Sequence, residues 1–435
     1  MSRRIREVSV DLWLGLALGA GTLALLMATL DEPTITWDEG YTITREDKVR
    51  SWFHLLISPE HPLFPGRLFG EPILQLCWPF ARQEPDGHPP FYAVLGVAGW
   101  LISHAWLPPL EAYRFGPVLL FSFTMGVMYV FVARRWGRLA GVTAAGSWLL
   151  MPRIFAHAHF ASYDMPLACL WFLSVAAFWK ACERWPISFR SGITWSVTFA
   201  VVLAMAAATK FTGWLIPLPL LAWSGVQGIA RLRREGIASL KWLLLPGVCV
   251  VPLLFVAPEV IRLLHKLAHT EAAVLETMPN ADPIKWPTMV ANEFRAQASG
   301  SVPFALAFLP AALWCVAAAW FGFRPSAAAR RPGSPLAATW SAAAVLTPPL
   351  TVALIPTWWP DPLRGLAIFL WANLTRQKTI AIPTLFFGKT YEFSLPWYNT
   401  LAWVFLTVPA ITFLIILFGL VATMASLGRV GNGAV

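Results

Sequence analysis

Long apolar runs alternate with short polar stretches along almost the whole of this 435-residue sequence. Many of the runs come close to the roughly 20 residues that a helix needs to cross a bilayer. The pattern therefore predicts an all-α polytopic membrane protein with about ten transmembrane helices. The predicted spans are residues 11–30, 115–133, 139–151, 165–179, 193–209, 213–230, 241–257, 303–323, 336–355 and 400–424.

Composition supports a membrane protein and excludes an ordinary soluble domain. Hydrophobic residues make up 57% of the chain and charged residues only 13%, whereas about a quarter of the residues in a soluble domain are charged. The first run lacks a small-residue cleavage site, so we interpret it as a retained helix and not as a signal peptide. The net charge of +10 does not indicate nucleic-acid binding, because the basic residues form short clusters between the apolar runs.

The basic clusters also predict the orientation of the chain. They follow every second predicted span, so the positive-inside rule is satisfied with both termini in the cytoplasm. The polar segments 31–114, 258–302 and 356–399 then lie on the outer face of the plasma (inner) membrane. The apolar stretch 91–106 would reverse this order if it crossed the bilayer, and we interpret it as an interfacial or re-entrant helix in the first outer loop.

This topology suggests a division of the chain into two modules. Residues 1–257 form an N-terminal transmembrane module that includes the first outer loop, 31–114. Residues 258–435 form a C-terminal transmembrane module with outer loops 258–302 and 356–399.

An adjacent pair of acidic residues marks the first outer loop. Asp38 and Glu39 follow the first span by a few residues, and such a pair is a poor lipid anchor and a poor helix former. A carboxylate held at the membrane surface can act as a general base toward a nearby proton donor. The pair would equally suit an ordinary solvated loop, so the motif alone leaves both interpretations open.

Three basic side chains are candidates for binding a phosphate. His88 precedes Pro89-Pro90, which fixes an extended backbone and can open a helix; this segment could also be a plain loop-to-helix junction. Lys210 lies in a very tight outer turn, and Arg114 lies at the outer start of the second span. Each of these two could instead snorkel to lipid headgroups.

Asp164 precedes an apolar helix at the outer face. Arg153, His157 and His159 are close to it in the sequence. A His-x-His pair with an aspartate can bind a metal, although this spacing is common by chance, so a divalent metal ion stays open as a cofactor. An aspartate at the start of a helix is also favoured by the helix dipole alone.

Aromatic residues are abundant in segments 357–365 and 386–399. They suit an interfacial belt, or they line a groove for an acceptor or a prenyl chain.

Taken together, these segments resemble the C-type membrane glycosyltransferases, in particular the protein-mannosyltransferase family and its bacterial relatives, including aminoarabinose transferases. The shared order is an Asp-Glu pair after the first helix, a His/Lys-Pro-Pro segment, an arginine, an aspartate before an apolar helix, and a Thr-Lys turn. Here these features are Asp38-Glu39, His88-Pro89-Pro90, Arg114, Asp164 and Thr209-Lys210. The resemblance covers roughly the first half of the chain, and the LPWYN segment at 395–399 is similar to bacterial members.

The resemblance implies an inverting glycosyltransferase that takes its sugar from a polyprenyl-phosphate donor on the outer face. The acceptor is a protein, a lipid or a glycan. In that picture Asp38 activates the acceptor hydroxyl, and Glu39 orients the site or binds a polar group of a substrate. Relatives often continue with more helices or an external domain, whereas this sequence ends soon after its last predicted span.

The resemblance also implies roles for the remaining candidates. Lys210, Arg114 and His88 would stabilise the lipid-phosphate leaving group, where negative charge develops. Asp164 would help to hold the site or a metal.

Two other functions compete with this one. A lipid or sugar-lipid flippase or transporter would need a polar path, but no charged residue or histidine lies in the middle of a predicted span and no inverted repeat is evident. A non-catalytic membrane scaffold would not need the carboxylates and Lys210 to converge.

Overall fold

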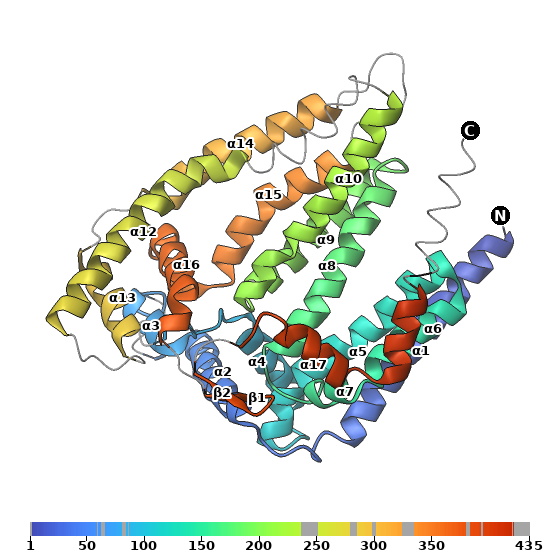
Figure 1. Ribbon diagram of the computed structural model, residues 1–435, viewed down its shortest axis with the longest axis horizontal. Helices are drawn as coiled ribbons and strands as arrows, with labels where there is room; N and C mark the ends of the chain where they lie inside the picture. Colours follow the sequence, from blue (N-terminus) through green and yellow to red (C-terminus); the bar gives the residue numbers. More distant parts are fainter. Residues whose placement is uncertain are drawn as a thin grey trace. The chain divides into compact units, whose positions relative to one another are not determined.

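A computed structural model gives the fold of residues 2–58, 60–61, 66–80, 84–85, 87–235, 251–278, 285–297, 302–323, 335–379, 383–392, 395–419 and 421. Within these ranges the chain is helical apart from one short hairpin (Figure 1). The α-helices are α1 (Ser2–Ala28), α2 (Trp37–Leu56), α3 (Glu71–Cys77), α4 (Phe91–Ser103), α5 (Pro109–Trp136), α6 (Arg138–Leu149), α7 (Pro152–His157), α8 (Asp164–Arg184), α9 (Phe189–Ala207), α10 (Pro217–Glu235), α12 (Val251–Thr277), α13 (Trp286–Gln297), α14 (Phe304–Phe323), α15 (Pro335–Ala353), α16 (Pro362–Thr379) and α17 (Asn399–Thr407). Two 3-10 helices are η1 (Phe211–Leu215) and η3 (Pro356–Trp358).

The hairpin pairs β1 (Thr384–Phe386) antiparallel to β2 (Lys389–Tyr391), with Phe386 opposite Lys389. Its two central residues, Phe387 and Gly388, have φ of 48° and 78°. A two-residue turn with positive φ at both positions matches the twist of the strands, and Gly388 adopts this conformation without strain.

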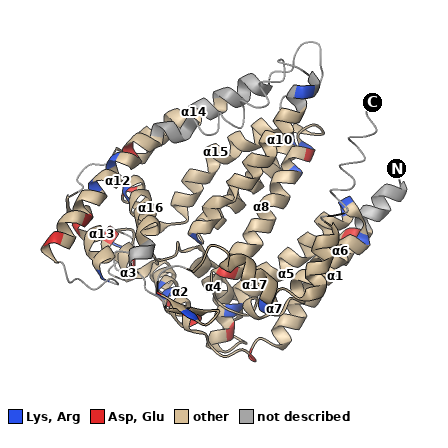
Figure 2. Cartoon of the chain, viewed as in Figure 1, with Lys and Arg blue, Asp and Glu red and all other residues tan. Residues whose placement is uncertain are grey.

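The predicted all-α polytopic membrane class is confirmed. Five described helices are long and apolar enough to cross a bilayer, namely α5, α8, α9, α15 and the part of α1 from Val10 to Ala28. A sixth is present if α17 and the helix after it, Ala410–Gly419, form one span bent by 114°. Charged side chains lie at the ends of α8 and α9, not along them (Figure 2).

The predicted number of ten spans is not confirmed. Helix α6 corresponds to the predicted span 139–151 but has only 12 residues, which is about 18 Å at 1.5 Å per residue and well short of a hydrocarbon core. Most of the predicted span 241–257 lies outside the described residues. Helix α4, with 13 residues, is too short to cross, which agrees with an interfacial or re-entrant helix at 91–106.

The polar segment that follows the predicted span 241–257 begins as a continuation of a helix. Helix α12 continues through Pro258 to Thr277. Its buried side chains include Val260, Leu263, Leu267 and Val274, which fall on one face at helical spacing. Packing of this apolar stripe therefore overrides the proline, which in a helix interior usually favours a break.

The described chain separates into two compact units. One comprises residues 1–22, 125–158 and 381–435, and the other comprises 23–124 and 159–380. The sequence-based division at residue 257 stays a prediction. The candidate site residues of segment 31–114, together with Asp164 and Lys210, lie in the second unit.

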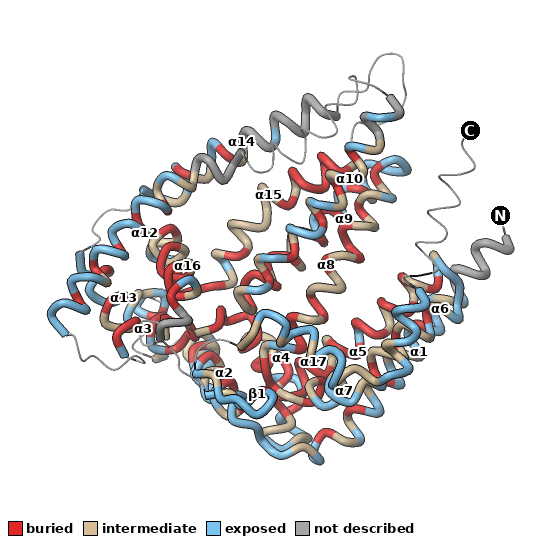
Figure 3. Tube along the Cα trace, viewed as in Figure 1, coloured by how far each residue is buried: buried red, intermediate tan, exposed pale blue. Residues whose placement is uncertain are grey.

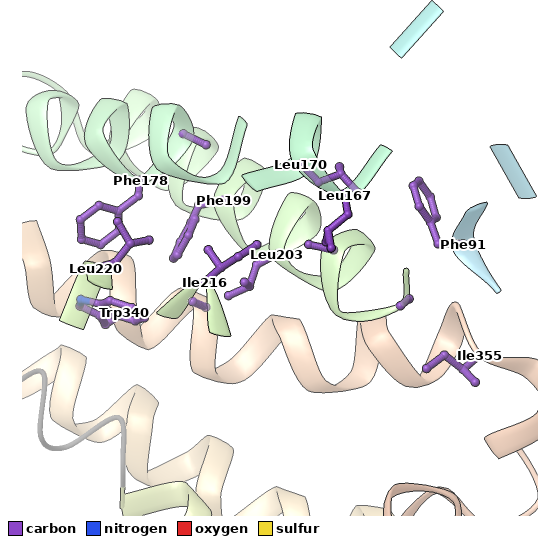
Figure 4. Packing of buried hydrophobic residues seen from close by; sticks show 14 of the residues in the cluster. Phe91, Leu167, Leu170, Phe178, Phe199, Leu203, Ile216, Leu220, Trp340 and Ile355 are labelled. Carbon is purple, nitrogen blue, oxygen red and sulfur yellow. The ribbon is translucent and has the colours of Figure 1, made fainter. Parts of the chain in front are cut away.

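The second unit has its main hydrophobic core among α8, α9, α10 and α15. Phe178, Phe199, Leu203 and Trp340 pack together there (Figure 4). The burial pattern marks the facing sides of these helices, while their other sides are more exposed (Figure 3). A second core joins α12, α13 and α16, and a third joins α2, α3 and α4. The third core and the start of α8 position the candidate site.

Candidate active site

The Asp-Glu pair lies in the first turn of helix α2, so the expectation that such a pair disfavours a helix is wrong. Thr36 is the N-cap, and its hydroxyl accepts a hydrogen bond from the Glu39 amide (3.3 Å). The Glu39 carboxylate accepts in return from the Thr36 amide (3.4 Å). This reciprocal capping box satisfies two amides that the helix itself leaves unpaired. Asp38 and Glu39 are also favoured in the first turn by the helix dipole.

Glu39 is fully buried and forms a two-point ion pair with Arg114 on α5. Its two oxygens accept from Nε and Nη2 of Arg114, each at 2.8 Å. The Ala161 amide donates to the same carboxylate at 2.9 Å. Arg114 is also fully buried, and its Nη1 donates to the carbonyl oxygens of Leu30 and Pro33 at 2.9 Å each. The charges of Glu39 and Arg114 therefore compensate each other inside the protein.

Close contact between α4 and α5 holds Arg114 in place. A Cβ at Gly99 of α4 would overlap the backbone of Gly116 on α5, and a Cβ at Gly116 would overlap the Leu95 carbonyl. Because both residues lack a side chain, the two backbones touch directly. Arg114 lies two residues before Gly116 in the sequence, so this contact fixes the position of Arg114 relative to α4.

Asp38 differs from its neighbour in every respect that matters for chemistry. Its side chain is exposed. Among the described residues, its carboxylate has no hydrogen bond or ion pair, and only its backbone carbonyl accepts, from the Thr42 hydroxyl. Asp38 is thus the member of the pair that is available to a substrate.

The loop after α7 is attached to the start of α2. The Thr42 hydroxyl donates to the Ala161 carbonyl oxygen at 2.6 Å, beside the bond from the Ala161 amide to Glu39. His159, also buried, shares a hydrogen bond with the Thr29 hydroxyl (2.8 Å). This loop ends at Asp164, the first residue of α8. The segment that carries Asp164 is therefore anchored to the helix that carries Asp38.

Asp164 and Lys210 form an ion pair, with Nζ of Lys210 at 2.7 Å from Oδ1 of Asp164. The Lys210 ammonium also lies 4.7 Å from the ring centroid of Tyr163. The same ring also contacts His88 and Tyr92, whose ring centroids are 3.9 and 5.8 Å away. The Lys210 and Asp164 side chains are 27% and 46% exposed, so a ligand can reach them.

A backbone hydrogen bond joins the two motifs that supply His88 and Lys210. The Phe91 amide, at the start of α4, donates to the Ala208 carbonyl at 2.8 Å. Gly213 makes the turn after Lys210 possible, because a Cβ there would overlap the Ala206 carbonyl. The structure therefore brings His88, Asp164 and Lys210 together around Tyr163.

Sequence reasoning missed several residues of this site. Tyr163 is the ring between His88 and Lys210, and its position directly before Asp164 is the signal that could have identified it. Arg45 and Glu84 form a second ion pair at 2.7 Å. Nothing in the local sequence indicates that pair.

Glu46 is the other residue that the sequence analysis missed. Both of its oxygens are buried without a hydrogen-bond partner among the described residues. Its carboxyl group fits against α4 only because position 96 is glycine, where a Cβ would overlap it. Burial raises the pKa of Glu46 well above its usual range, and the charge of Glu39 raises it further. Burial without a described hydrogen-bond partner therefore favours the neutral form of the Glu46 carboxyl group.

Replacing Glu46 by glutamine should stabilise the protein at neutral pH. The unfolded chain releases the Glu46 proton near pH 4.5, whereas the folded protein retains it, so the free energy of unfolding falls as pH rises from there toward the raised pKa. Glutamine is neutral at every pH and removes that loss, so the gain in stability over the wild type should be larger at pH 8 than at pH 5. Thermal unfolding of the purified protein at pH 5 and pH 8 measures it.

The exposed Glu32 provides the control for this substitution. Glu32→Gln should leave the pH dependence of the unfolding midpoint as it is in the wild type. An equal difference between Glu46→Gln and wild type at pH 5 and pH 8 would contradict a neutral Glu46.

Other candidates from the sequence are not part of the contacts described above. Arg153 and His157 belong to the other compact unit. The His159 ring is bound to Thr29, and in the described part of the chain no group of three or more His, Cys, Asp or Glu side chains is arranged to hold a metal ion. Segment 357–365 packs in the core of the second unit through Trp358, and 395–399 belongs to the other unit.

Comparison with known proteins gives one match. Residues 103–268 match the family model of dolichyl-phosphate-mannose-protein mannosyltransferase. Arg114, Asp164 and Lys210 lie inside the matched region, and Asp38, Glu39 and His88 precede it. No curated protein matches the chain, and no solved structure matches it.

Proposed function

From the family match, which supports a mannosyltransferase-like C-type glycosyltransferase of the membrane, we propose that this protein is an inverting glycosyltransferase. It moves a sugar from a polyprenyl-phosphate donor to a hydroxyl group of an acceptor on the outer face of the membrane. The observation that carries the proposal is that two features lie in one unit: the exposed Asp38, whose carboxylate has no bond to a described residue, and the Lys210–Asp164 ion pair. The loop at Ala161 links the helix of Asp38 to the segment that carries Asp164.

Asp38 acts as the general base in this proposal. It takes the proton of the acceptor hydroxyl while the hydroxyl oxygen attacks the anomeric carbon. The bond from that carbon to the phosphate oxygen breaks, and the phosphate leaves on its polyprenyl chain. One displacement inverts the anomeric centre, so no covalent nucleophile on the protein is needed.

Glu39 and Arg114 position the site and do not take part in the chemistry. The Glu39 carboxylate is fully occupied by Arg114 and two amides, so it cannot accept a substrate proton. Arg114 uses Nε, Nη1 and Nη2 for contacts inside the protein. This geometry favours a positioning role for Arg114 over the phosphate contact expected from the sequence.

Lys210 and His88 are the residues proposed to receive the developing phosphate charge. In the absence of a donor, Asp164 neutralises Lys210. A bound phosphate would compete with Asp164 for the Lys210 ammonium. The Tyr163 ring contacts both Lys210 and His88 and restricts their positions. Preorganised positive groups are most effective where charge forms in the transition state.

Lys210→Met should lower the rate of sugar transfer by about 100-fold, the usual cost of removing one charge-stabilising donor. The unfolding midpoint should change little, since a partly exposed ion pair contributes at most about 1 kcal/mol. Initial rates with a labelled polyprenyl-phosphate sugar measure the effect.

Lys180→Met is the matched control, because Lys180 pairs with Glu183 near the other end of α8. Equal transfer rates for the two methionine variants would remove Lys210 from the mechanism.

The proposed function is tested by comparing outer-surface proteins, lipids and glycans of cells with and without the gene by mass spectrometry. We expect a mass increment of one sugar to be lost from a defined acceptor when the gene is absent. A reconstituted protein that moves labelled sugar-lipid between leaflets, and never breaks its sugar–phosphate bond, would instead establish a flippase.

A further inference from the structure

A narrow polar pocket lies outside the site described above, among α3, η3, α13 and α16. It is lined by Glu71, Gln75, Arg295, Thr357, Asp361 and Arg364, with Phe80 and Trp358 as an aromatic wall. All these residues belong to the second compact unit. Gly365 permits the wall, since a Cβ there would overlap the Trp358 indole.

Two buried polar atoms in this pocket lack a partner. Gln75 and Thr357 are 6% and 8% exposed. The Gln75 amide nitrogen donates to the Thr357 carbonyl (3.3 Å), but Oε1 of Gln75 and the Thr357 hydroxyl have no hydrogen bond among the described residues. Buried polar groups in native proteins almost always have a protein, water or ligand partner. Within the described part of the chain, these two atoms are therefore open to a hydrogen-bonding occupant.

The charges of the pocket limit what that occupant can be. Arg364 lies 3.9 Å from a Glu71 oxygen and 3.7 Å from an Asp361 oxygen, which is too far for a hydrogen bond to either, so its donors are only partly used. An anion would meet these carboxylates, and a cation would meet Arg295 and Arg364. A neutral group that both donates and accepts hydrogen bonds, such as a sugar hydroxyl, satisfies all of them.

The wall of the pocket continues toward Lys210. Phe369 contacts Phe80 and Trp358, with ring centroids 5.3 and 5.9 Å away. The same ring contacts Phe211 and Trp214, at 5.8 and 5.5 Å, in the turn that follows Lys210. One layer of aromatic side chains thus joins the pocket to the candidate active site. Phe80 is buried in this layer with φ of 64°, a conformation that costs free energy and often accompanies a functional site.

We propose that this pocket, which has room for about one water-sized group, is a sugar-binding subsite that takes one hydroxyl group of a ring lying at its mouth. This proposal rests on the proposed transferase function, which supplies the sugar. The sugar belongs either to the donor or to a glycan acceptor. Thr357, Gln75 and Arg364 then determine which sugar is accepted. A site built to bind a hydroxyl discriminates strongly against a sugar that lacks it, because its own polar groups are left unpaired.

Thr357→Val tests the subsite, because valine has the same shape and removes only the unpartnered hydroxyl. Purified full-length protein is titrated with D-mannose, D-glucose, D-galactose and L-arabinose while its unfolding midpoint is followed. We expect one sugar to stabilise the wild type with saturation. The variant should unfold at the same or a higher temperature without sugar, and its Kd for that sugar should rise roughly three- to tenfold.

Thr351→Val is the control, since Thr351 is a buried threonine on α15 whose hydroxyl is bonded to the Thr347 carbonyl. It should keep the wild-type Kd. Sugars that are excluded from the protein surface stabilise folded proteins without saturation. Only a saturable difference between the two valine variants therefore supports the subsite. A wild-type Kd in Thr357→Val, or no saturable sugar in the panel, would overturn it and leave the pocket to water.

Transfer kinetics identify the source of the sugar and separate the two proposals. A raised KM for the donor in Thr357→Val indicates the donor sugar, and a raised KM for the acceptor indicates a glycan acceptor. If wild-type protein transfers sugar but Thr357→Val has unchanged KM values and sugar binding, the subsite fails and the transferase stands. If no donor supports transfer but saturable sugar binding is lost in Thr357→Val, the transferase fails and the sugar pocket stands.

Discussion

Replacing Asp38 by asparagine is expected to lower the rate of sugar transfer by about 100- to 10,000-fold, the range for loss of a general base. The amide has almost the same shape as the carboxylate but cannot take the proton of an acceptor hydroxyl. The fold should persist, because the Asp38 side chain is exposed and has no bond to a described residue that the change would break. Initial transfer rates at saturating donor and acceptor measure the effect, with the unfolding midpoint as the check on folding.

Asp47→Asn is the matched control for this change. Asp47 lies on the same helix, and its carboxylate accepts from Arg50 and Tyr113. It has no proposed role in transfer, so its variant should retain most of the wild-type rate. A transfer rate for Asp38→Asn as high as that of Asp47→Asn would show that Asp38 is not the base.

Replacing Arg114 by methionine is expected to lower the free energy of unfolding by about 3–5 kcal/mol, as found when one partner of a buried ion pair is removed. The Glu39 carboxylate would stay fully buried without a cation, and the carbonyls of Leu30 and Pro33 would lose their donor. The unfolding midpoint and the yield of folded protein after purification measure the loss.

A double variant separates the cost of an unpaired buried charge from the cost of changing the packing around it. Glu39→Gln combined with Arg114→Met removes both charges, and the double variant should be more stable than the sum of the single changes predicts. Arg138→Met, which breaks the more exposed pair with Asp11, should cost no more than about 1 kcal/mol. Arg114→Met no less stable than Arg138→Met would contradict the structural role of the buried pair.

The membrane class and several helices follow from hydropathy alone, because long apolar runs have few alternatives. The same pattern failed where packing decides the outcome. Helix α12 passes Pro258 because a buried apolar stripe continues beyond it. Helix α2 is the opposite case, since its buried face carries Glu39, Thr42 and Glu46 together with Val49. No hydrophobic periodicity reveals a helix that is buried through polar residues.

Residue type and order made Asp38, Asp164 and Lys210 candidates, and the structure shows contacts for them without testing their roles. Their membership of an active site stays a prediction. The partner of Glu39 could not be predicted, because Arg114 is 75 residues away in sequence and an arginine near a membrane surface suits headgroups or phosphate equally well. The pocket at Gln75 and Thr357 was also invisible, since its hydrogen bond joins positions 282 residues apart.

The contacts of Glu39 also constrain the order in which this protein can mature during synthesis. Its cation is on α5, and the amide that completes its coordination is at Ala161, beyond α6 and α7. In a nascent chain that has not reached Ala161, the Glu39 carboxylate therefore lacks one of its hydrogen-bond donors. The start of α2, which carries Asp38, makes its contacts with the loop at Ala161 only after the following helices have been synthesised. A ribosome-bound fragment that ends within segment 31–114 therefore has part of the sequence of the site without its geometry.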